Sequence, residues 1–302
     1  MNTQERLKTI DDTISTLANE QSYVSVSHAH GADVPMPSTD KLREIVRLCR
    51  EIIFPGYFGD TMRRESIKFY IGLNVDTLSE MLKREIYAGL CFSWTPEEAE
   101  ELDVVATYRQ ADELTVRFIA QLPELRRLLK GDVLAIFNGD PAALNTGEVI
   151  FAYPGIRAIS NYRIAHALYK MNVPLIPRII TEMAHSETGI DIHPRAEIGE
   201  NFAIDHGTGV VIGATSIIGN NVKIYQGVTL GAKSFPMDEN GNPIKGIPRH
   251  PIIEDNVVIY SQATILGRVT IGHDSTIGGN VWITENIPAG SKIVQKGSKN
   301  YI

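Results

Sequence analysis

One histidine of this sequence, His206, stands where a regular pattern of aliphatic residues breaks. The surrounding segment reads DIHPRAEIGENFAIDHGTGVVIG, residues 191–213, and from Ile192 to Val210 an aliphatic residue recurs at every sixth position. The register then shifts by two residues, and the shift brackets His206. An imidazole can take up or release a proton near neutral pH. Because a stack of identical turns needs no histidine, we interpret His206 as a candidate for proton transfer rather than for packing.

The aliphatic repeat itself predicts a stack of short strands. Aliphatic residues keep the six-residue interval in three runs: Ile192, Ile198, Ile204, Val210; Ile212, Ile218, Ile224, Leu230; and Ile253, Ile259, Ile265, Ile271, Ile277, Ile283. β-branched residues followed by glycine are typical of short strands joined by tight corners. Three such strands close one triangular coil with the aliphatic side chains inside, and coils stack about 4.8 Å apart. Residues 187–290 are sufficient for about five coils.

The rest of the chain divides into an inserted loop and a helical half. Residues 231–252, GAKSFPMDENGNPIKGIPRHPI, are rich in glycine, proline and aspartate or asparagine, which predicts an exposed loop. The segment LREIVRLCREII, residues 42–53, has the spacing of an amphipathic helix, and Ser38 is a candidate N-cap. We predict an α+β protein with a helical domain over residues 1–186. A β-helix domain follows over residues 187–302, with the 231–252 loop and a C-terminal tail.

Composition excludes several classes of protein. The formal net charge is -7, from 36 acidic and 29 basic side chains, and no basic block is present. A nucleic-acid partner is therefore not expected. The N-terminus lacks the apolar core of a signal peptide, and no apolar run approaches the roughly 20 residues that span a bilayer. We expect a soluble, cytoplasmic protein with no membrane partner, in which Cys49 and Cys91 remain free thiols.

Five motifs carry a family resemblance. They are NYRIAHALY, DIHPRAEIG, DHGTGVVIG, VTLG and RHP, and they occur in this order between residues 120 and 290. In order and approximate spacing they resemble the hexapeptide-repeat acyltransferases, and most closely the serine O-acetyltransferases. The resemblance implies a left-handed parallel β-helix, against the usual right-handed rule for parallel crossovers. It also implies transfer of acetyl from acetyl-CoA to the hydroxyl of L-serine in cysteine biosynthesis, with no metal.

The resemblance implies roles for two residues at the centre of the reaction. His206 matches the family's general base, which takes the proton from the serine hydroxyl as that hydroxyl attacks the thioester; such a base typically contributes about 10²–10⁴-fold. Asp191 matches the carboxylate that holds the other ring nitrogen and stabilises the imidazolium. The separation of 15 residues between Asp191 and His206 permits a contact between neighbouring coils without proving it. We predict direct transfer with no acyl-enzyme.

Four further positions match the family's substrate site. Asp140 and Asp205 match acidic residues near the amino group of serine, and Arg249 and His250 match the pair on its carboxylate side. The arginine fork suits a carboxylate because it can bind both oxygens.

The resemblance also suggests where acetyl-CoA binds. Backbone N–H groups near Gly231 and Ala232 are candidates to stabilise the tetrahedral oxyanion, with His250 as an alternative. By alignment with family positions, Ser261, Thr276 and Gly279 contact CoA along the stack.

Alternatives remain open at this point. The family commonly has glutamate where this chain has Ala214, and the loop is longer than in compact members, so homoserine or a related acceptor stays an alternative to serine. A sugar acceptor is a weaker one. A zinc-dependent hydratase of β-helix type needs about three converging histidines, and His193, His206 and His250 are available. A non-catalytic scaffold explains the repeat but not the matching polar residues.

The resemblance implies partners as well. The family forms homotrimers, often paired into hexamers, with active sites between subunits, and cysteine inhibits by competing at the serine site. A C-terminal isoleucine, here Ile302, can insert into O-acetylserine sulfhydrylase, the next enzyme in cysteine synthesis.

Overall fold

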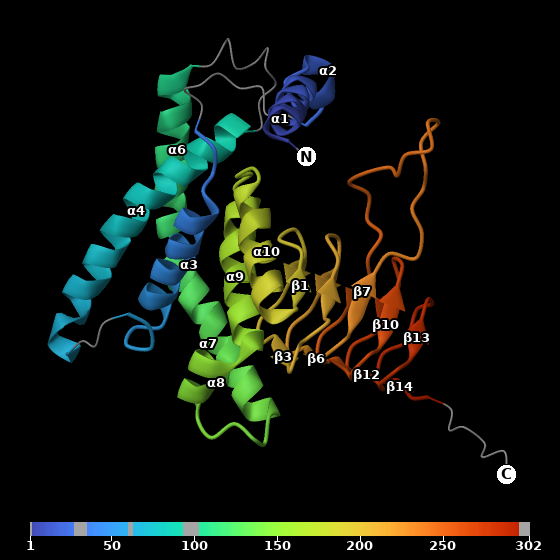
Figure 1. The fold of residues 1–302 in the computed structure, drawn as a ribbon. Coiled ribbons are helices and arrows are strands. Elements are labelled where there is room, and N and C mark those ends of the chain that lie inside the picture. The colour runs from blue at the N-terminus through green and yellow to red at the C-terminus, as the bar shows by residue number, and fades with distance from the viewer. Residues whose placement is uncertain (1, 27–34, 60–62, 93–102, 296–302) are drawn as a thin grey trace.

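The computed structural model describes residues 2–26, 35–59, 63–92 and 103–295, and Figure 1 shows a helical half followed by a stack of short strands. The helices are α1 (Thr3–Leu17), α2 (Glu20–Tyr23), α3 (Thr39–Ile53), the 3₁₀ helix η1 (Arg64–Ser66), α4 (Ile67–Phe92), α6 (Val104–Ile119), α7 (Leu122–Gly139), α8 (Thr146–Ala152), α9 (Pro154–Lys170) and α10 (Ile176–Thr188). None of these described helices is both long and apolar enough to cross a membrane. The predicted α+β class is confirmed. The tail that ends at Ile302 lies outside the described residues.

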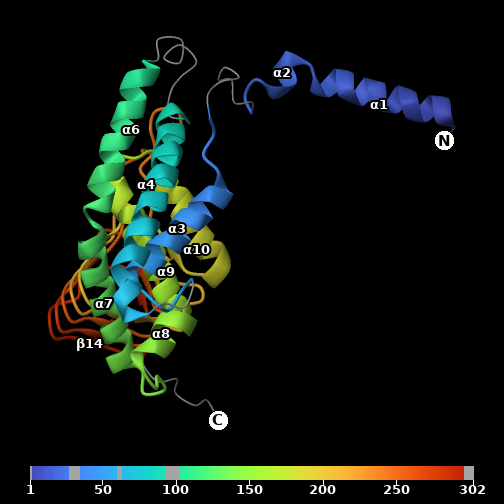
Figure 2. The same cartoon turned by 90° about the vertical axis from the view of Figure 1, so that its left-hand side faces the viewer.

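The predicted amphipathic helix is present as α3. The Ser38 side chain accepts a hydrogen bond from the backbone N–H of Lys41 at 3.3 Å, which caps the first turn. Leu42, Ile45 and Cys49 are fully buried on the inner face of the helix. Cys49 and Cys91 are both buried and unpaired, as expected for free thiols. In contrast, α1 buries no residue and projects away from α3–α10 (Figure 2).

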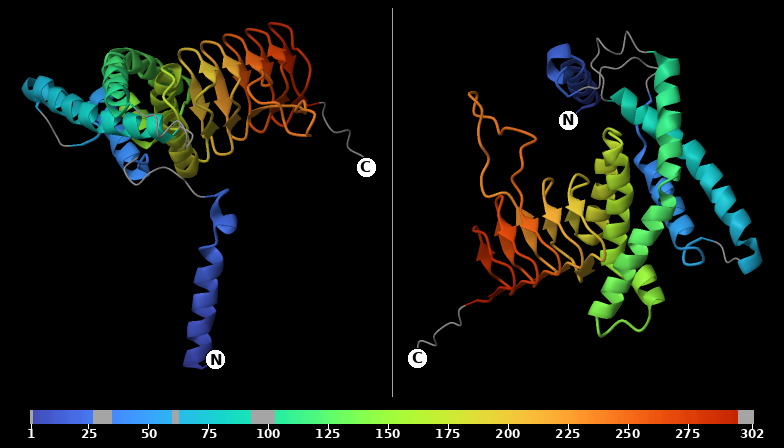
Figure 3. Two further views of the ribbon diagram at one scale, coloured as in Figure 1. Left: turned by 90° about the horizontal axis from the view of Figure 1, so that it is seen from above. Right: turned by 180° about the vertical axis from the view of Figure 1, so that it is seen from behind.

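The strands form a parallel solenoid of three sheets. They are β1 (Asp191–Ile192), β2 (Glu197–Ile198), β3 (Ala203–Asp205), β4 (Val211–Ile212), β5 (Ile217–Ile218), β6 (Lys223–Tyr225), β7 (Thr229–Gly231), β8 (Ile252–Ile253), β9 (Val258–Ile259), β10 (Thr264–Leu266), β11 (Thr270–Ile271), β12 (Thr276–Ile277), β13 (Trp282–Ile283) and β14 (Lys292–Ile293). The sheet orders are β1-β4-β7-β10-β13, β11-β8-β5-β2 and β14-β12-β9-β6-β3, which we call the first, second and third sheets. Each of the first four coils contributes one strand to each sheet, and the last coil joins the second sheet only through the bridge between Ile271 and Ile287. The solenoid is therefore a triangular prism, the left-handed β-helix of the hexapeptide repeats (Figure 3).

Two of the three edges of the prism matter for the site. Edge A comprises the corners where the chain passes from the third sheet to the first, residues 206–210, 226–228, 260–263 and 278–281. Edge B comprises the corners from the first sheet to the second, residues 193–196, 213–216, 232–251 and 267–269. The predicted loop belongs to edge B, because it connects β7 to β8, and it rises from the prism in orange in Figure 1.

The repeat fills the interior of the prism as predicted. The six isoleucines from Ile253 to Ile283 are at most 5% exposed, and they stack from coil to coil. Several corners place a residue other than glycine in the left-handed region, mostly asparagine, as at Asn221 (φ 56°) and Asn280 (φ 56°). His206, with φ 59°, occupies one of these corners. Asparagine tolerates this conformation better than most residues, so His206 stands where the fold alone favours asparagine.

A buried ion pair fastens the helical half to the first coil. Arg163 on α9 binds Asp132 on α7 through two bonds, Nε to Oδ2 at 2.7 Å and a terminal nitrogen to Oδ1 at 2.8 Å. The same guanidinium donates to the backbone carbonyls of Ile198 and Gly199, and Asp132 accepts the backbone N–H of Phe202. Both charged side chains are almost fully buried, so each depends on the other for compensation.

Breaking this pair should destabilise the protein strongly. We expect Arg163→Met to lower the free energy of unfolding by about 3–5 kcal/mol, because Asp132 would be left buried without a counter-charge. Denaturant unfolding at fixed protein concentration measures the change. Arg127→Met is the control, since Arg127 is half exposed where it pairs with Glu124 and Glu200, and it should cost at most about 1 kcal/mol. Equal losses in the two variants would contradict this role for the buried pair.

A close backbone approach sets the position of α9 beside the third sheet. A Cβ atom at Gly155, in the first turn of α9, would collide with the backbone carbonyl oxygen of Ile204 on β3. Only glycine allows this approach. As a result Tyr153, which precedes α9, lies beside edge A.

Candidate active site

His206 projects from edge A into solvent. It follows β3 directly, and its side chain is 74% exposed, so a substrate can reach the ring. Its Nε2 atom lies 3.8 Å from Oδ1 of Asp205, which is longer than a hydrogen bond. The neighbouring Asp205 side chain is only 15% exposed. The predicted base, His206, and the predicted substrate-binding residue Asp205 therefore lie together at this corner, with the imidazole outermost.

A lysine ties Asp205 to the helical half. Lys223 Nζ lies 2.9 Å from Oδ2 of Asp205 and donates to the backbone carbonyl of Gly139 at 2.7 Å, at the end of α7. Burial alone would lower the pKa of Lys223, but its contacts with Tyr225 and Asp205 outweigh burial and raise that pKa. Lys223 is therefore a fixed positive charge that holds one oxygen of Asp205. The other oxygen, Oδ1, faces His206.

The hydrogen bond between Lys223 and the carbonyl of Gly139 also positions the next residue, Asp140, at the site. The Tyr153 hydroxyl donates to Oδ2 of Asp140 at 2.6 Å, and the backbone N–H of Ala142 donates to Oδ1 at 2.8 Å. These two hydrogen bonds lower the pKa of Asp140, in that order of importance, and the charges of Lys223 and His206 act in the same direction. The Tyr153 pKa is raised to about 12 by the same bond. Asp140 is thus an ionised carboxylate within electrostatic reach of His206.

Lys223 and Tyr153 were not predicted from the sequence as site residues. Tyr153 has no signal in the sequence, because it reaches Asp140 only through the close packing of α9 on β3. Lys223 had one. In the β3–β6 register Ala203 pairs with Lys223 and Asp205 pairs with Tyr225, so Asp205 and Lys223 lie two residues apart on adjacent coils.

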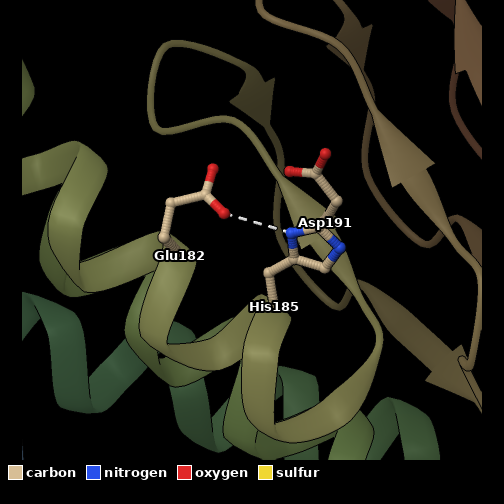
Figure 4. Close-up of side chains that lie close together, drawn as sticks. All are labelled: Glu182, His185 and Asp191. Carbon is tan, nitrogen blue, oxygen red and sulfur yellow. Dashed lines mark hydrogen bonds and ion pairs between the residues drawn. The ribbon is translucent and has the colours of Figure 1, made fainter. Parts of the chain in front are cut away.

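Asp191 is not the ion-pair partner of His206 in the described part of the single chain. It begins β1 and pairs with Val211, and no ion pair within 4 Å joins it to His206 among the residues described here. Instead, Figure 4 shows Asp191 beside Glu182 and His185 of α10. The Nδ1 atom of His185 lies 3.1 Å from the Oε2 atom of Glu182. The carboxylate within 4 Å of His206 is Asp205, so the role of Asp191 as the partner of His206 stays a prediction.

Glu182, His185 and Asp191 could by geometry hold a cation. One ligand atom from each lies within 4.8 Å of the others. However, Arg178 already pairs with Glu182 and competes for its carboxylate. We therefore assign no metal to this group.

Edge B carries the other predicted substrate residues. His250 is only 7% exposed, and its Nδ1 accepts the backbone N–H of Thr215 at 3.1 Å. Burial, together with the positive charges of Arg249 and Arg268, lowers the pKa of His250 to about 4. The Nε atom of Arg249 is buried without a hydrogen-bond partner among the described residues, and the guanidinium lies 5.6 Å from the ring centre of Phe235. A neutral histidine and an unpaired arginine donor are therefore neighbours on this edge.

The inserted loop folds back along edge B and encloses a cavity. Arg195, on the first coil, donates to the backbone carbonyl of Gly246 at 3.2 Å. The cavity is about 370 Å³ and is lined by His193, Arg195, Ala214, Phe235, Pro243, Ile244, Lys245, Gly246 and Arg249. Its lining is strongly basic. Ala214, where the family commonly has glutamate, therefore faces the loop rather than His206.

The two groups of site residues lie on different edges of the prism. His206, Asp205 and Asp140 lie at edge A, whereas Arg249 and His250 lie at edge B. One side of the prism, the first sheet, lies between them. This side is about five extended residues wide, so the two edges are roughly 16 Å apart at the usual rise of about 3.3 Å per residue. A single chain therefore brings the acidic residues to His206 but not the basic pair.

The predicted CoA residues also divide between the edges. A Cβ at Gly279 would lie 3.0 Å from the backbone oxygen of Ser261, so these two corners of edge A are in contact. Thr276 is on β12, which leads into the Gly279 corner, whereas Gly231 and Ala232 begin the loop of edge B.

The zinc alternative requires three histidines that one chain does not bring together. His193 and His250 are neighbours on edge B, where burial and nearby arginines, with His250 itself, lower the pKa of His193 to about 4. His206 is on edge A. Among the described residues, the group with metal-ligand spacing is the one around His185, not these three.

Acid should destabilise the fold through His250. Its pKa is about 4 in the folded chain against about 6.5 when unfolded, so between these values only the unfolded chain binds the proton. We expect this residue to remove about 2 kcal/mol from the free energy of unfolding between pH 7 and pH 5. Denaturant unfolding at both pH values, at one protein concentration, measures the loss. His250→Gln should show a correspondingly smaller loss, and an identical loss in both proteins would refute this assignment.

Comparisons with known proteins agree with this architecture. Residues 250–285 match the family model described as bacterial transferase hexapeptide (six repeats). The chain is 51% identical over 287 residues to the plasmid serine acetyltransferase of Synechococcus elongatus, covering 94% of this chain and 90% of that protein. It also resembles the crystal structure of serine acetyltransferase isoform 3 from Entamoeba histolytica in complex with cysteine. The TM-score is 0.70 and the sequence identity is 35%, and the match covers 93% of this chain and 91% of that chain. A serine acetyltransferase solved in complex with CoA gives a TM-score of 0.52 at 25% identity, over 84% of this chain and 97% of that one. The chain belongs to the serine acetyltransferase family.

Proposed function

We propose that this protein transfers the acetyl group of acetyl-CoA to the hydroxyl of L-serine, with His206 as the general base. The observation that carries this mechanism is the arrangement at edge A. An exposed imidazole stands beside two carboxylates, Asp205 and Asp140, whose positions are fixed by Lys223 and Tyr153. The carboxylates suit the ammonium group of serine, and the imidazole suits its hydroxyl. The product is O-acetyl-L-serine, an intermediate of cysteine biosynthesis.

The reaction needs no covalent enzyme intermediate. His206 takes the proton from the serine hydroxyl while its oxygen attacks the thioester carbonyl carbon, giving a tetrahedral oxyanion. Backbone N–H groups near Gly231 and Ala232, or His250, are the candidates to stabilise that oxyanion. The carbon–sulfur bond then breaks, and the CoA thiolate takes the proton back from the imidazolium. Ser261, Thr276 and Gly279 are the candidate contacts for CoA on the edge A side.

We infer that a partner subunit completes the site. We expect Arg249 to bind the serine carboxylate, because its buried, unpaired Nε–H is suited to a carboxylate oxygen. Arg249, however, lies on edge B, whereas His206 lies on edge A. A cyclic homotrimer places edge B of one copy against edge A of the next. The trimer is therefore the smallest assembly that we propose, and whether two trimers pair into a hexamer is a further prediction.

Asp191 retains its proposed role as the carboxylate that orients His206. In the single chain it lies beside Glu182 and His185. We also propose that cysteine, which differs from serine only by sulfur in place of oxygen, competes for the same site. The domain division at residues 186 and 187, cytoplasmic location and docking of Ile302 onto the sulfhydrylase remain predictions.

The acceptor is tested by comparing L-serine with L-homoserine at saturating acetyl-CoA. Release of CoA, followed with a thiol reagent, should give a kcat/KM at least about tenfold higher for serine, because one methylene moves the hydroxyl away from a base fixed on a corner. Product mass should identify O-acetyl-L-serine. Faster turnover of homoserine would replace the proposed acceptor while leaving the mechanism in place.

A further inference from the structure

A second cavity, lined by five arginines, lies in the helical half, away from both edges of the prism. It measures about 810 Å³ and opens between α3, α9 and α10. Its lining also holds three glutamates, and two more carboxylates that are not part of the lining, Asp40 and Glu51, pair with its arginines. The volume is typical of small-molecule sites.

The arginines of this cavity are not equivalent. Four of them have carboxylate partners: Arg43 with Asp40, Arg47 with Glu44 and Glu51, Arg157 with Glu187, and Arg178 with Glu182. Arg50 has none within ion-pair distance among the described residues. Its Nε atom is buried and lacks a hydrogen-bond partner there, and its guanidinium carbon lies 4.2 Å from the ring centre of Phe58.

A second guanidinium, that of Arg157, lines the same cavity as Arg50. Burial and the positive charge of Arg157 together lower the pKa of Arg50 to about 10, while the carboxylate of Glu187 acts in the opposite direction. Arg50 therefore remains protonated at neutral pH and half-buried, without an ion-pair partner of its own among the described residues. Leaving a buried charged donor unpaired is unfavourable, and an anion between the two groups would remove that cost.

We propose that this cavity binds the phosphate group of a small phosphorylated molecule, with Arg50 as its anchor and Arg157 as the second donor. The two guanidinium groups come from different helices, α3 and α9. A tetrahedral dianion can accept bonds from both directions, whereas a carboxylate offers one planar pair of oxygens. The rest of the volume has room for the group that carries the phosphate. This inference does not depend on the acetyl-transfer mechanism, because none of its residues lies at edge A or edge B.

Isothermal titration with inorganic phosphate and with glycerol 3-phosphate, at constant ionic strength, tests the proposal on the full chain. We expect saturable binding with one site per chain. Tighter binding of glycerol 3-phosphate would show that the rest of the cavity contributes, and equal affinity would show that the phosphate group alone is recognised. Arg50→Gln should weaken binding by about 10–100-fold, the loss expected for a charge-assisted hydrogen bond.

Two variants keep the test interpretable. Arg43→Gln removes an exposed, paired arginine of the same helix and should bind phosphate like the wild type. Arg50→Lys keeps the positive charge but loses the paired N–H donors of the guanidinium, so this variant should bind phosphate with intermediate affinity. Acetyl transfer to serine reports that each variant is folded. Binding unchanged in Arg50→Gln, or heats reproduced by sodium chloride at equal ionic strength, would overturn the proposal.

Discussion

Replacing His206 with asparagine should lower kcat for acetyl transfer to L-serine by about 10²–10⁴-fold, the usual contribution of a positioned general base. Asparagine is the informative substitution because His206 has φ 59°, a conformation that neighbouring corners fill with asparagine. The backbone turn should therefore survive while the proton acceptor is lost. The side chain is 74% exposed, so its removal should leave no cavity and little change in stability.

Initial rates at saturating serine and acetyl-CoA measure the effect, and thermal unfolding checks the fold. His273→Asn is a matched control, because His273 is also an exposed histidine of the solenoid, hydrogen-bonded at 2.7 Å to Asp274 and remote from edge A. It should retain wild-type kcat. A His206→Asn enzyme within about threefold of wild type would remove His206 from the role of base.

Mixed trimers of two inactive variants should recover about a third of the wild-type rate per chain. His206→Asn removes the general base from edge A of its own subunit, whereas Arg249→Gln removes the serine-binding arginine from edge B. If each site combines edge A of one chain with edge B of the next, every mixed trimer contains one site in which both are intact. At a serine concentration well below the wild-type KM each parent alone should be nearly inactive, His206→Asn through kcat and Arg249→Gln through a KM for serine raised by about 10–100-fold.

Co-expression with two different affinity tags, followed by two purification steps, isolates the mixed trimers. Serial dilution and light scattering confirm that they stay assembled during the assay. Mixed trimers no more active than the average of the two parents would place both edges of each site in one chain. That outcome would contradict the shared site without affecting the role of His206.

Much of the architecture was predictable because burial in this fold is periodic. The isoleucines from Ile253 to Ile283 face the interior at every sixth residue, so the sequence states which side chains are inside and how the chain turns. The helix at residues 42–53 was predictable for the same reason, from a stripe of buried residues. The loop at 231–252 interrupts the period, and its turn-forming residues identify it.

The site was predictable only in part. Resemblance and the break in the repeat pointed to His206, Asp205 and Asp140, and the structure brings these three together. The contact between Asp191 and His206 does not follow from their spacing, because a coil corner decides which way each side chain points. Tyr153 reaches Asp140 only because Gly155 packs against β3, and that approach is invisible in the sequence.

The most direct test of the central claim is a crystal structure of the assembled protein with L-serine bound. Our account predicts a ring nitrogen of His206 within about 2.6–3.2 Å of the serine hydroxyl oxygen. It also predicts the serine ammonium group beside Asp205 and Asp140, and its carboxylate on Arg249 of the partner subunit. A serine molecule bound away from His206, or held by Arg249 of the same chain as that His206, would contradict the account.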